Sequence, residues 1–170
     1  ISDALDACST NVMMADAEFN IVYMNPAVLN MMRTAETDLK KELPNFNAND
    51  LIGQNIDVFH KNPAHQRSML SRLTETYKTV IQVGARTFSL IATPIYDDER
   101  NRLGTVVEWA DKTSEVHIEK EVANLIAAAN SGDLTKRLDT QGQKGFANTL
   151  SMGLNELMDK ISGFVTDVGI

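Results

Sequence analysis

The fold of this chain is decided first by the stretch Asn20-Ile21-Val22-Tyr23-Met24-Asn25-Pro26. Its apolar and β-branched residues predict a short strand over residues 20–24. Asn25-Pro26 then ends the strand and opens a helix, because asparagine caps helix N-termini and proline fits the first turn. We expect this helix to cover Ala27–Arg33.

Strand and helix patterns alternate on both sides of this stretch. A strand over Asn11–Asp16 is predicted before it, and the polar segment 34–49 is expected to contain at most short helices. Pro63 then begins a longer helix. Its apolar face would be formed at helical spacing by Met69, Leu70, Leu73 and Tyr77.

The next part of the sequence predicts three antiparallel strands. They cover 78–83, 86–96 and 103–110, and they are joined by the turn Gly84-Ala85 and by a polar loop over 97–101. Pairing Tyr96 with Leu103 places Leu90 directly opposite Trp109, so both side chains lie on one face of the sheet. The same face would carry Phe88 and Val107. Two strands, several helices and three strands together predict an α+β domain with a five-stranded antiparallel sheet and helices on one face.

This order of elements resembles the PAS fold, and the stretch at 20–26 resembles its second-strand signature. Asp111-Lys112-Thr113 resembles the Asp-x-Thr motif that ends the last PAS strand. The resemblance covers residues 1–113. It implies that Asp111 and Thr113 couple the sensor domain to the helix that follows.

After residue 113 the pattern is helical to the end of the chain. Ile118, Val122, Leu125 and Ala129 form a narrow apolar stripe, which Leu150, Leu154, Leu157, Ile161, Phe164 and Val168 continue. Such a stripe indicates a coiled-coil or bundle seam, so at least two copies are expected to associate.

Between these helices, Gly132 suits a helix end, and Leu134 and Leu138 can anchor an extended connector. Residues 114–170 therefore resemble a HAMP domain of methyl-accepting chemotaxis proteins, which implies a homodimer through these helices. A helical hairpin that serves as a simple linker is the alternative. Gln143-Lys144-Gly145 departs from the Glu-x-Gly that is common in HAMP domains.

Charge and cysteine content narrow the class of protein. The net charge of −7 disfavours nucleic acid and anionic membranes as partners. The single Cys8 favours a reducing, cytoplasmic compartment, and no apolar run approaches the roughly 20 residues of a membrane span. The chain starts at Ile1 without a signal-peptide pattern, so we expect a piece of a longer protein. It contains no glycine-rich phosphate loop and no Gly-x-Ser-x-Gly or His-Glu-x-x-His motif, and no enzyme activity is predicted.

His60 and His65 are the histidines placed to bind a ligand. Ile56, Val58 and Phe59 should bury one side of the segment before His60, which puts its imidazole at the lip of an apolar cavity, as an axial haem ligand requires. A partly buried histidine bonded to backbone is the alternative for His60. For Trp109 the alternative is a core-packing role.

The segment 59–67, with Leu90 and Trp109, resembles the haem-containing PAS domain of soluble aerotaxis receptors. The resemblance implies that His60 ligates haem iron, that Trp109 donates a hydrogen bond to bound oxygen and that Leu90 packs beside it. His65 could reach a haem propionate. Because Cys-x-x-Cys-His is absent, the cofactor would be noncovalent haem b.

The expected function is therefore oxygen or diatomic gas sensing, relayed through the helices to a chemotaxis signalling domain in the full-length protein. Two other readings stay open. The domain could bind flavin and sense redox state, or it could be a ligand-free dimerisation and relay module whose cavity is filled by side chains. The eight methionines of the chain are compatible with a filled cavity, because methionine fits irregular spaces.

Overall fold

The computed structural model describes residues 2–60 and 62–169. It divides the chain into two compact units, Ile1–Thr113 and Ser114–Ile170. Lys61, which belongs to the segment 59–67 that resembles the haem-containing PAS domain, lies outside the described residues. Ile1 and Ile170, the first and last residues of the two predicted domains, lie outside them as well.

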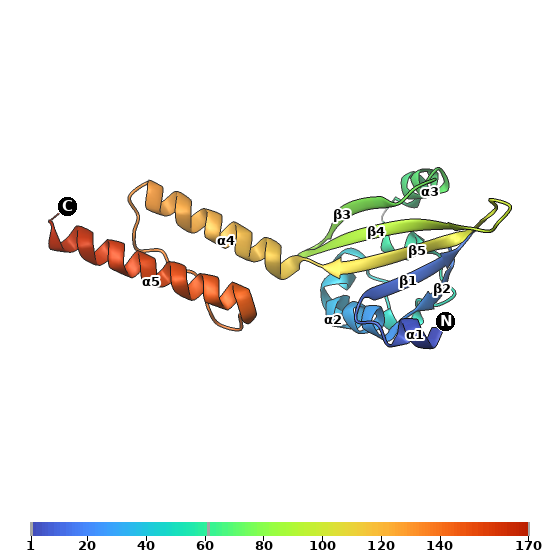
Figure 1. Cartoon of the computed structure of the whole chain (residues 1–170), viewed down its shortest axis with the longest axis horizontal. Coiled ribbons are helices and arrows are strands. Elements are labelled where there is room, and N and C mark those ends of the chain that lie inside the picture. Colours follow the sequence, from blue (N-terminus) through green and yellow to red (C-terminus); the bar gives the residue numbers. More distant parts are fainter. Residues whose placement is uncertain (1, 61, 170) are drawn as a thin grey trace. The chain divides into compact units, whose positions relative to one another are not determined.

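A five-stranded sheet with antiparallel neighbours forms the centre of the first unit, in the order β2-β1-β5-β4-β3 (Figure 1). The strands are β1 (Asn11–Asp16), β2 (Ile21–Met24), β3 (Tyr77–Val83), β4 (Arg86–Tyr96) and β5 (Arg102–Asp111). The helices of this unit are α1 (Ser2–Asp6), α2 (Pro26–Glu42), α3 (Pro63–Ser71) and the 3-10 helices η1 (Ala48–Asp50) and η2 (Ile56–Phe59). The predicted five-stranded antiparallel sheet is confirmed, and buried residues of α2, η1 and η2 share one core with its inner face.

Asn25 explains why the stretch at 20–26 is decisive. Its side chain is fully buried, and its Oδ1 accepts hydrogen bonds from the backbone N–H of Val12 (3.0 Å) and Val28 (3.1 Å). Its Nδ2 donates to the carbonyl oxygens of Leu5 (3.1 Å) and Thr10 (2.8 Å). The side chain thus caps α2 as predicted, and it also fastens that helix to β1 and α1.

Helix α2 is longer than predicted, and the expectation of at most short helices over 34–49 is wrong for its first part. The helix continues to Glu42 because Ala35 and Leu39 extend the buried face of Val28 and Met32 at helical spacing. An i,i+4 ion pair between Glu36 and Lys40 supports the same turns.

Helix α3 is shorter than predicted. It ends at Ser71, and Tyr77 opens β3 instead of closing the helical face. Side chains of a strand alternate between its two faces, so Tyr77, Thr79 and Ile81 all turn toward one side. The helical spacing of Tyr77 from Leu70 and Leu73 concealed this second periodicity.

The register predicted between β4 and β5 is correct for the residues that face the core. Leu90 lies opposite Trp109, as predicted. At the loop end, however, Tyr96 pairs with Arg102 and not with Leu103, because the register shifts between Ile95 and Tyr96. The shift lies beyond the residues that face the core.

The second unit consists of two helices and an extended connector. Helices α4 (Thr113–Asn130) and α5 (Gly145–Asp167) run in the same direction (Figure 1). Leu138 of the connector is buried with Leu125 and Met158, and Leu134 packs against them. Asn155 holds the connector in place, since its Oδ1 accepts from Leu138 N (2.7 Å) and its Nδ2 donates to Leu138 O (2.9 Å).

Part of the predicted seam stays uncovered in the second unit. Val122, Ala129 and Leu154 pack within the unit. In contrast, Leu157, Ile161, Phe164 and Val168 are exposed. In residues 2–60 and 62–169, no helix combines the length and apolar character that a membrane span needs.

Candidate functional site

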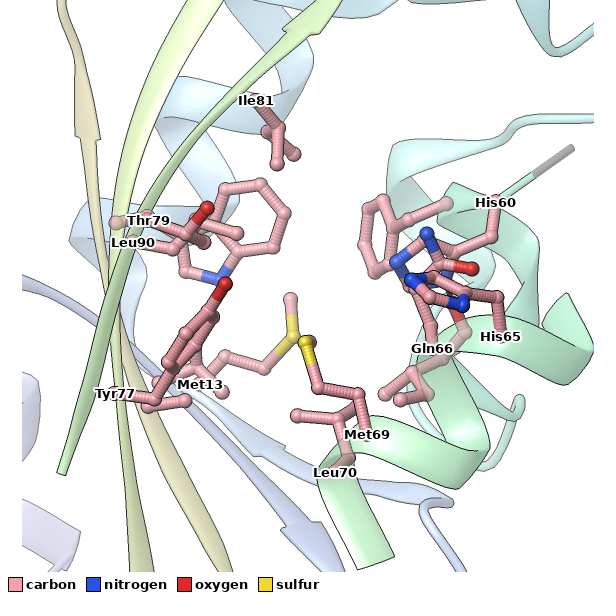
Figure 2. A pocket seen from close by; sticks show the side chains of 15 residues that line it. Met13, His60, His65, Gln66, Met69, Leu70, Tyr77, Thr79, Ile81 and Leu90 are labelled. Carbon is pink, nitrogen blue, oxygen red and sulfur yellow. Dashed lines mark hydrogen bonds between the residues drawn. The ribbon is translucent and has the colours of Figure 1, made fainter. Parts of the chain in front are cut away.

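A cavity of about 250 Å³ lies in the first unit between α3, η2 and the inner face of the sheet. In Figure 2, His60, His65 and Gln66 lie on one side, opposite Tyr77, Thr79 and Leu90 of the sheet. Met13 and Met69 lie between the two walls. The other lining residues are mostly apolar: Ile56, Phe59, Leu70, Ile81, Ala92, Val107 and Trp109. All four ligand-site residues predicted from the sequence therefore border the same cavity.

Strand pairing positions the sheet side of the cavity. Thr79 on β3 lies opposite Leu90 on β4, and Leu90 lies opposite Trp109 on β5. Directly opposed residues share a face, so these three side chains form one row across three strands. Trp109 is fixed from its other side by pairing with Asn11 on β1.

Trp109 is held in place by contacts of its ring with other aromatic rings and not by a hydrogen bond of its indole N–H. Its ring lies 5.1 Å from the Phe59 ring and 5.7 Å from the Phe88 ring, measured between centroids. The side chain is 7% exposed, and its Nε1 is buried with no hydrogen-bond partner among the described residues. An unmet buried donor costs about 1–3 kcal/mol, which a bound acceptor would recover. Core packing alone explains the ring and leaves the N–H without a role.

His60 follows η2 directly and caps its C-terminus. Its Nδ1 lies 3.0 Å from the carbonyl oxygen of Ile56. That oxygen can only accept, so Nδ1 carries the proton in the neutral ring and Nε2 keeps a free lone pair. Burial lowers the pKa of His60 below its usual range, against the opposing effects of the Ile56 hydrogen bond and the Asp57 charge. The residue is therefore a backbone-bonded histidine and, at the same time, a neutral imidazole with one nitrogen available as a ligand.

His65 lies in α3 and is exposed, although it borders the cavity. A side chain at the rim can contact the polar edge of a bound group. The role predicted for His65 stays a prediction. Gln66, which the sequence analysis missed, points to the same place, because its Oε1 is buried without a partner among the described residues. Its spacing of three and four residues from Met69 and Leu70 could have placed it on the cavity face of α3.

Asp111 and Thr113 lie at the end of β5, outside the cavity. Asp111 Oδ1 accepts from the backbone N–H of Thr113 (3.0 Å) and from its hydroxyl (2.5 Å). Thr113 Oγ1 in turn accepts from the backbone N–H of Thr87 (3.0 Å). The motif thus caps α4 and ties its first residue to β4.

A five-stranded antiparallel sheet in this order, with helices and an apolar cavity on its inner face, defines the PAS class of sensor domain. No family model matches the sequence. The sequence is 48% identical over 168 residues to the methyl-accepting chemotaxis protein McpB of Pseudomonas aeruginosa, which covers 99% of this chain and 25% of that protein. The chain thus spans about a quarter of this curated relative.

Among solved structures, the Aer2 receptor from Vibrio cholerae, described as a dual PAS-heme oxygen sensor, matches with a TM-score of 0.54 and 41% identity. The match covers 60% of this chain and 93% of that chain. The chain therefore belongs to the PAS domain family of chemotaxis receptors. An RNA-binding light-oxygen-voltage receptor, at 18% identity and a TM-score of 0.52 over 74% of this chain and 36% of that chain, shares the fold alone.

Proposed function

We propose that residues 1–113 bind haem b noncovalently and sense oxygen as part of a chemotaxis receptor. One observation carries the proposal: a buried indole N–H without a partner and a neutral imidazole with a free Nε2 border the same apolar cavity. The first is a donor for a gas ligand and the second is a ligand for iron. The description of the Aer2 receptor as a haem oxygen sensor supports the same assignment.

The residues present fit a haem better than a bare metal ion. In residues 2–60 and 62–169, no group of three His, Cys, Asp or Glu side chains could hold a metal ion. Haem needs only one protein ligand, which His60 would supply. The cavity of about 250 Å³ is slightly smaller than the roughly 300–1,000 Å³ of ligand pockets. We expect Met13 and Met69 to move aside on binding, because unbranched thioethers adapt readily.

Haem iron, when bound, supplies the open site for a diatomic gas. Trp109 would then donate its N–H to the gas ligand, and an indole can neither accept that bond nor lose its proton at neutral pH. Leu90, directly opposite Trp109, would keep water away from the same place. His65 at the rim would contact a propionate.

An absorption spectrum of the purified chain, after incubation with haem b and removal of the excess, tests this function. We expect an intense Soret band whose position changes on exposure to carbon monoxide. A flavin doublet in the protein as isolated would instead favour a redox sensor. A chain that takes up neither group would leave the ligand-free relay module as the function.

We further propose that residues 114–170 form a HAMP-like relay that associates with a second copy. The two parallel helices, the connector anchored by Leu138, and the uncovered row of Leu157, Ile161, Phe164 and Val168 support this arrangement. Apolar side chains at this spacing on one helix face are typical of a bundle seam. The similarity to a methyl-accepting chemotaxis protein, of which this chain spans about a quarter, supports a downstream signalling domain in the full-length protein. The single free Cys8 supports a cytoplasmic location.

Replacing Leu157 with glutamate should convert a dimer into a monomer, because the new carboxylate would lie in the seam. Leu157 tests the seam more directly than Leu154, because Leu157 is exposed whereas Leu154 packs within its own unit. Thr166→Glu is the matched control, since residue 166 lies about two and a half turns further along and faces the opposite side of α5. Sedimentation velocity over a range of concentrations measures both. A parent chain that stays monomeric, or a Leu157→Glu variant as dimeric as the control, would contradict the seam.

A further inference from the structure

Three charged side chains meet where the sheet ends and α4 begins. Arg86, the first residue of β4, donates from Nε to Asp38 Oδ2 on α2 (2.8 Å). The same guanidinium donates from Nη1 to Asp111 Oδ2 at the end of β5 (2.9 Å). The three side chains are 22% to 26% exposed, so the pairs are screened less by water than fully exposed ion pairs are.

Asp111 has two tasks in this arrangement. Its Oδ2 accepts from Arg86, while its Oδ1 accepts from the backbone N–H and the hydroxyl of Thr113. Both oxygens belong to one planar carboxylate, so the Arg86 contact fixes the orientation in which Asp111 caps α4. The backbone strengthens the same junction, because Lys112 N donates to Thr87 O (2.8 Å) and Thr87 N donates to Thr113 Oγ1 (3.0 Å).

Helix α2 touches this junction through the turn between β3 and β4 as well. A Cβ added at Gly84 would lie 3.3 Å from Glu42 Cγ and 3.6 Å from the backbone oxygen of Asp38. Gly84 has φ +59°, which glycine adopts without strain. The turn therefore lies directly against the last turns of α2, beside the Asp38–Arg86 pair.

We propose that Asp38 and Arg86 are positioning residues for signal coupling, and that with Asp111 they form a brace that joins α2 to the start of α4. The brace is defined by these three residues. It adds a second route from the cavity to the junction. The first route runs along β5 from Trp109 to Asp111. The second runs through the core, where α2 residues Met32 and Leu39 are buried in the same cluster as Trp109, and then through Asp38 and Arg86.

The role of the brace at the junction does not depend on the ligand, whereas its role in coupling rests on the proposed function. Two measurements on the intact chain separate the role of the brace at the junction from its role in coupling. Asp38→Asn and Arg86→Gln each remove one charge from the brace. Glu36→Gln is the matched control, because Glu36 lies on the same helix and its contacts with Lys40 (2.8 Å) and the backbone of Ala48 do not involve the brace. Folding of each variant is checked by thermal unfolding.

The first measurement is hydrogen exchange by NMR at the backbone amides of Thr87, Lys112 and Thr113 in the ligand-free chain. Loss of the Asp38–Arg86 pair should speed local opening by about fivefold in Asp38→Asn. Arg86→Gln loses both pairs and should speed it at least as much. The control should exchange like the parent. Exchange in Asp38→Asn as slow as in Glu36→Gln would overturn the brace.

The second measurement compares the same amides in the haem-loaded chain with and without oxygen, beside the oxygen dissociation rate. We expect Asp38→Asn to keep the parent dissociation rate and to lose the oxygen-dependent change in exchange. A change as large as that of the parent would restrict coupling to β5 and refute the route through α2. If the parent takes up no haem, the proposed function fails, while the first measurement still decides whether the brace holds the junction.

Discussion

Replacing His60 with alanine is expected to leave the purified chain unable to retain haem. The residue would supply the single protein bond to iron, and its orientation is already fixed by the 3.0 Å hydrogen bond from Nδ1 to the Ile56 carbonyl oxygen. Removing an outer partner of a metal ligand typically weakens binding by about 10–100-fold, and removing the ligand itself should exceed that loss. The ratio of Soret to protein absorbance after identical haem loading measures the effect.

His65→Ala is the matched control, because His65 borders the same cavity but is exposed at its rim. This variant should keep the parent iron-ligation spectrum, because the propionate contact proposed for His65 is separate from the bond to iron. Added imidazole should restore a histidine-type spectrum to His60→Ala by entering the space left at the lip of the cavity. If His60→Ala shows the parent spectrum without imidazole, His60 is not the ligand, and the assignment would pass to His65.

Replacing Trp109 with phenylalanine should weaken oxygen binding while haem and carbon monoxide binding persist. Phenylalanine can keep the aromatic contacts with Phe59 and Phe88, so the change removes mainly the N–H. A hydrogen bond to a partly charged acceptor contributes about 1.5–3 kcal/mol, which corresponds to roughly tenfold or more in oxygen retention.

Carbon monoxide provides the internal control, because its bound form is less polar and depends less on a donor. The measurement is the oxygen dissociation rate beside the carbon monoxide dissociation rate, in the variant and in the parent. We expect a faster rate for oxygen alone. An oxygen rate unchanged by the substitution would reduce Trp109 to a core residue, and its buried N–H would need another partner.

Sequence patterns were most reliable where local chemistry alone determines the structure. The cap by Asn25 and the strand boundaries at Gly84 follow from backbone requirements of single residues, and the pairing of Leu90 with Trp109 follows from counting along a hairpin. Tyr77 was misplaced because its spacing satisfies both a helix and a strand, and only packing against the sheet decides between them.

The site was partly accessible from sequence for the same reason. His60 and Trp109 carry distinctive chemistry that the sequence alone reveals, whereas the cavity that joins them depends on the tertiary structure. Gln66 and Thr79 were missed because their significance comes from the cavity that they border from opposite sides, which depends on how α3 faces the sheet. The Asp38–Arg86 contact spans 48 residues, and nothing in either local sequence indicates it.

The shift in register between Ile95 and Tyr96 makes the outer loop of the β4–β5 hairpin a suitable insertion point. Inward from the shift, β5 is paired with β4 on one side and with β1 on the other, from Gly104 to Trp109. A longer or shorter loop over 97–101 could be absorbed at the irregular pair, so the position of Trp109 would not change. A fluorescent peptide or an affinity tag placed there would report on the sensor domain without touching its cavity.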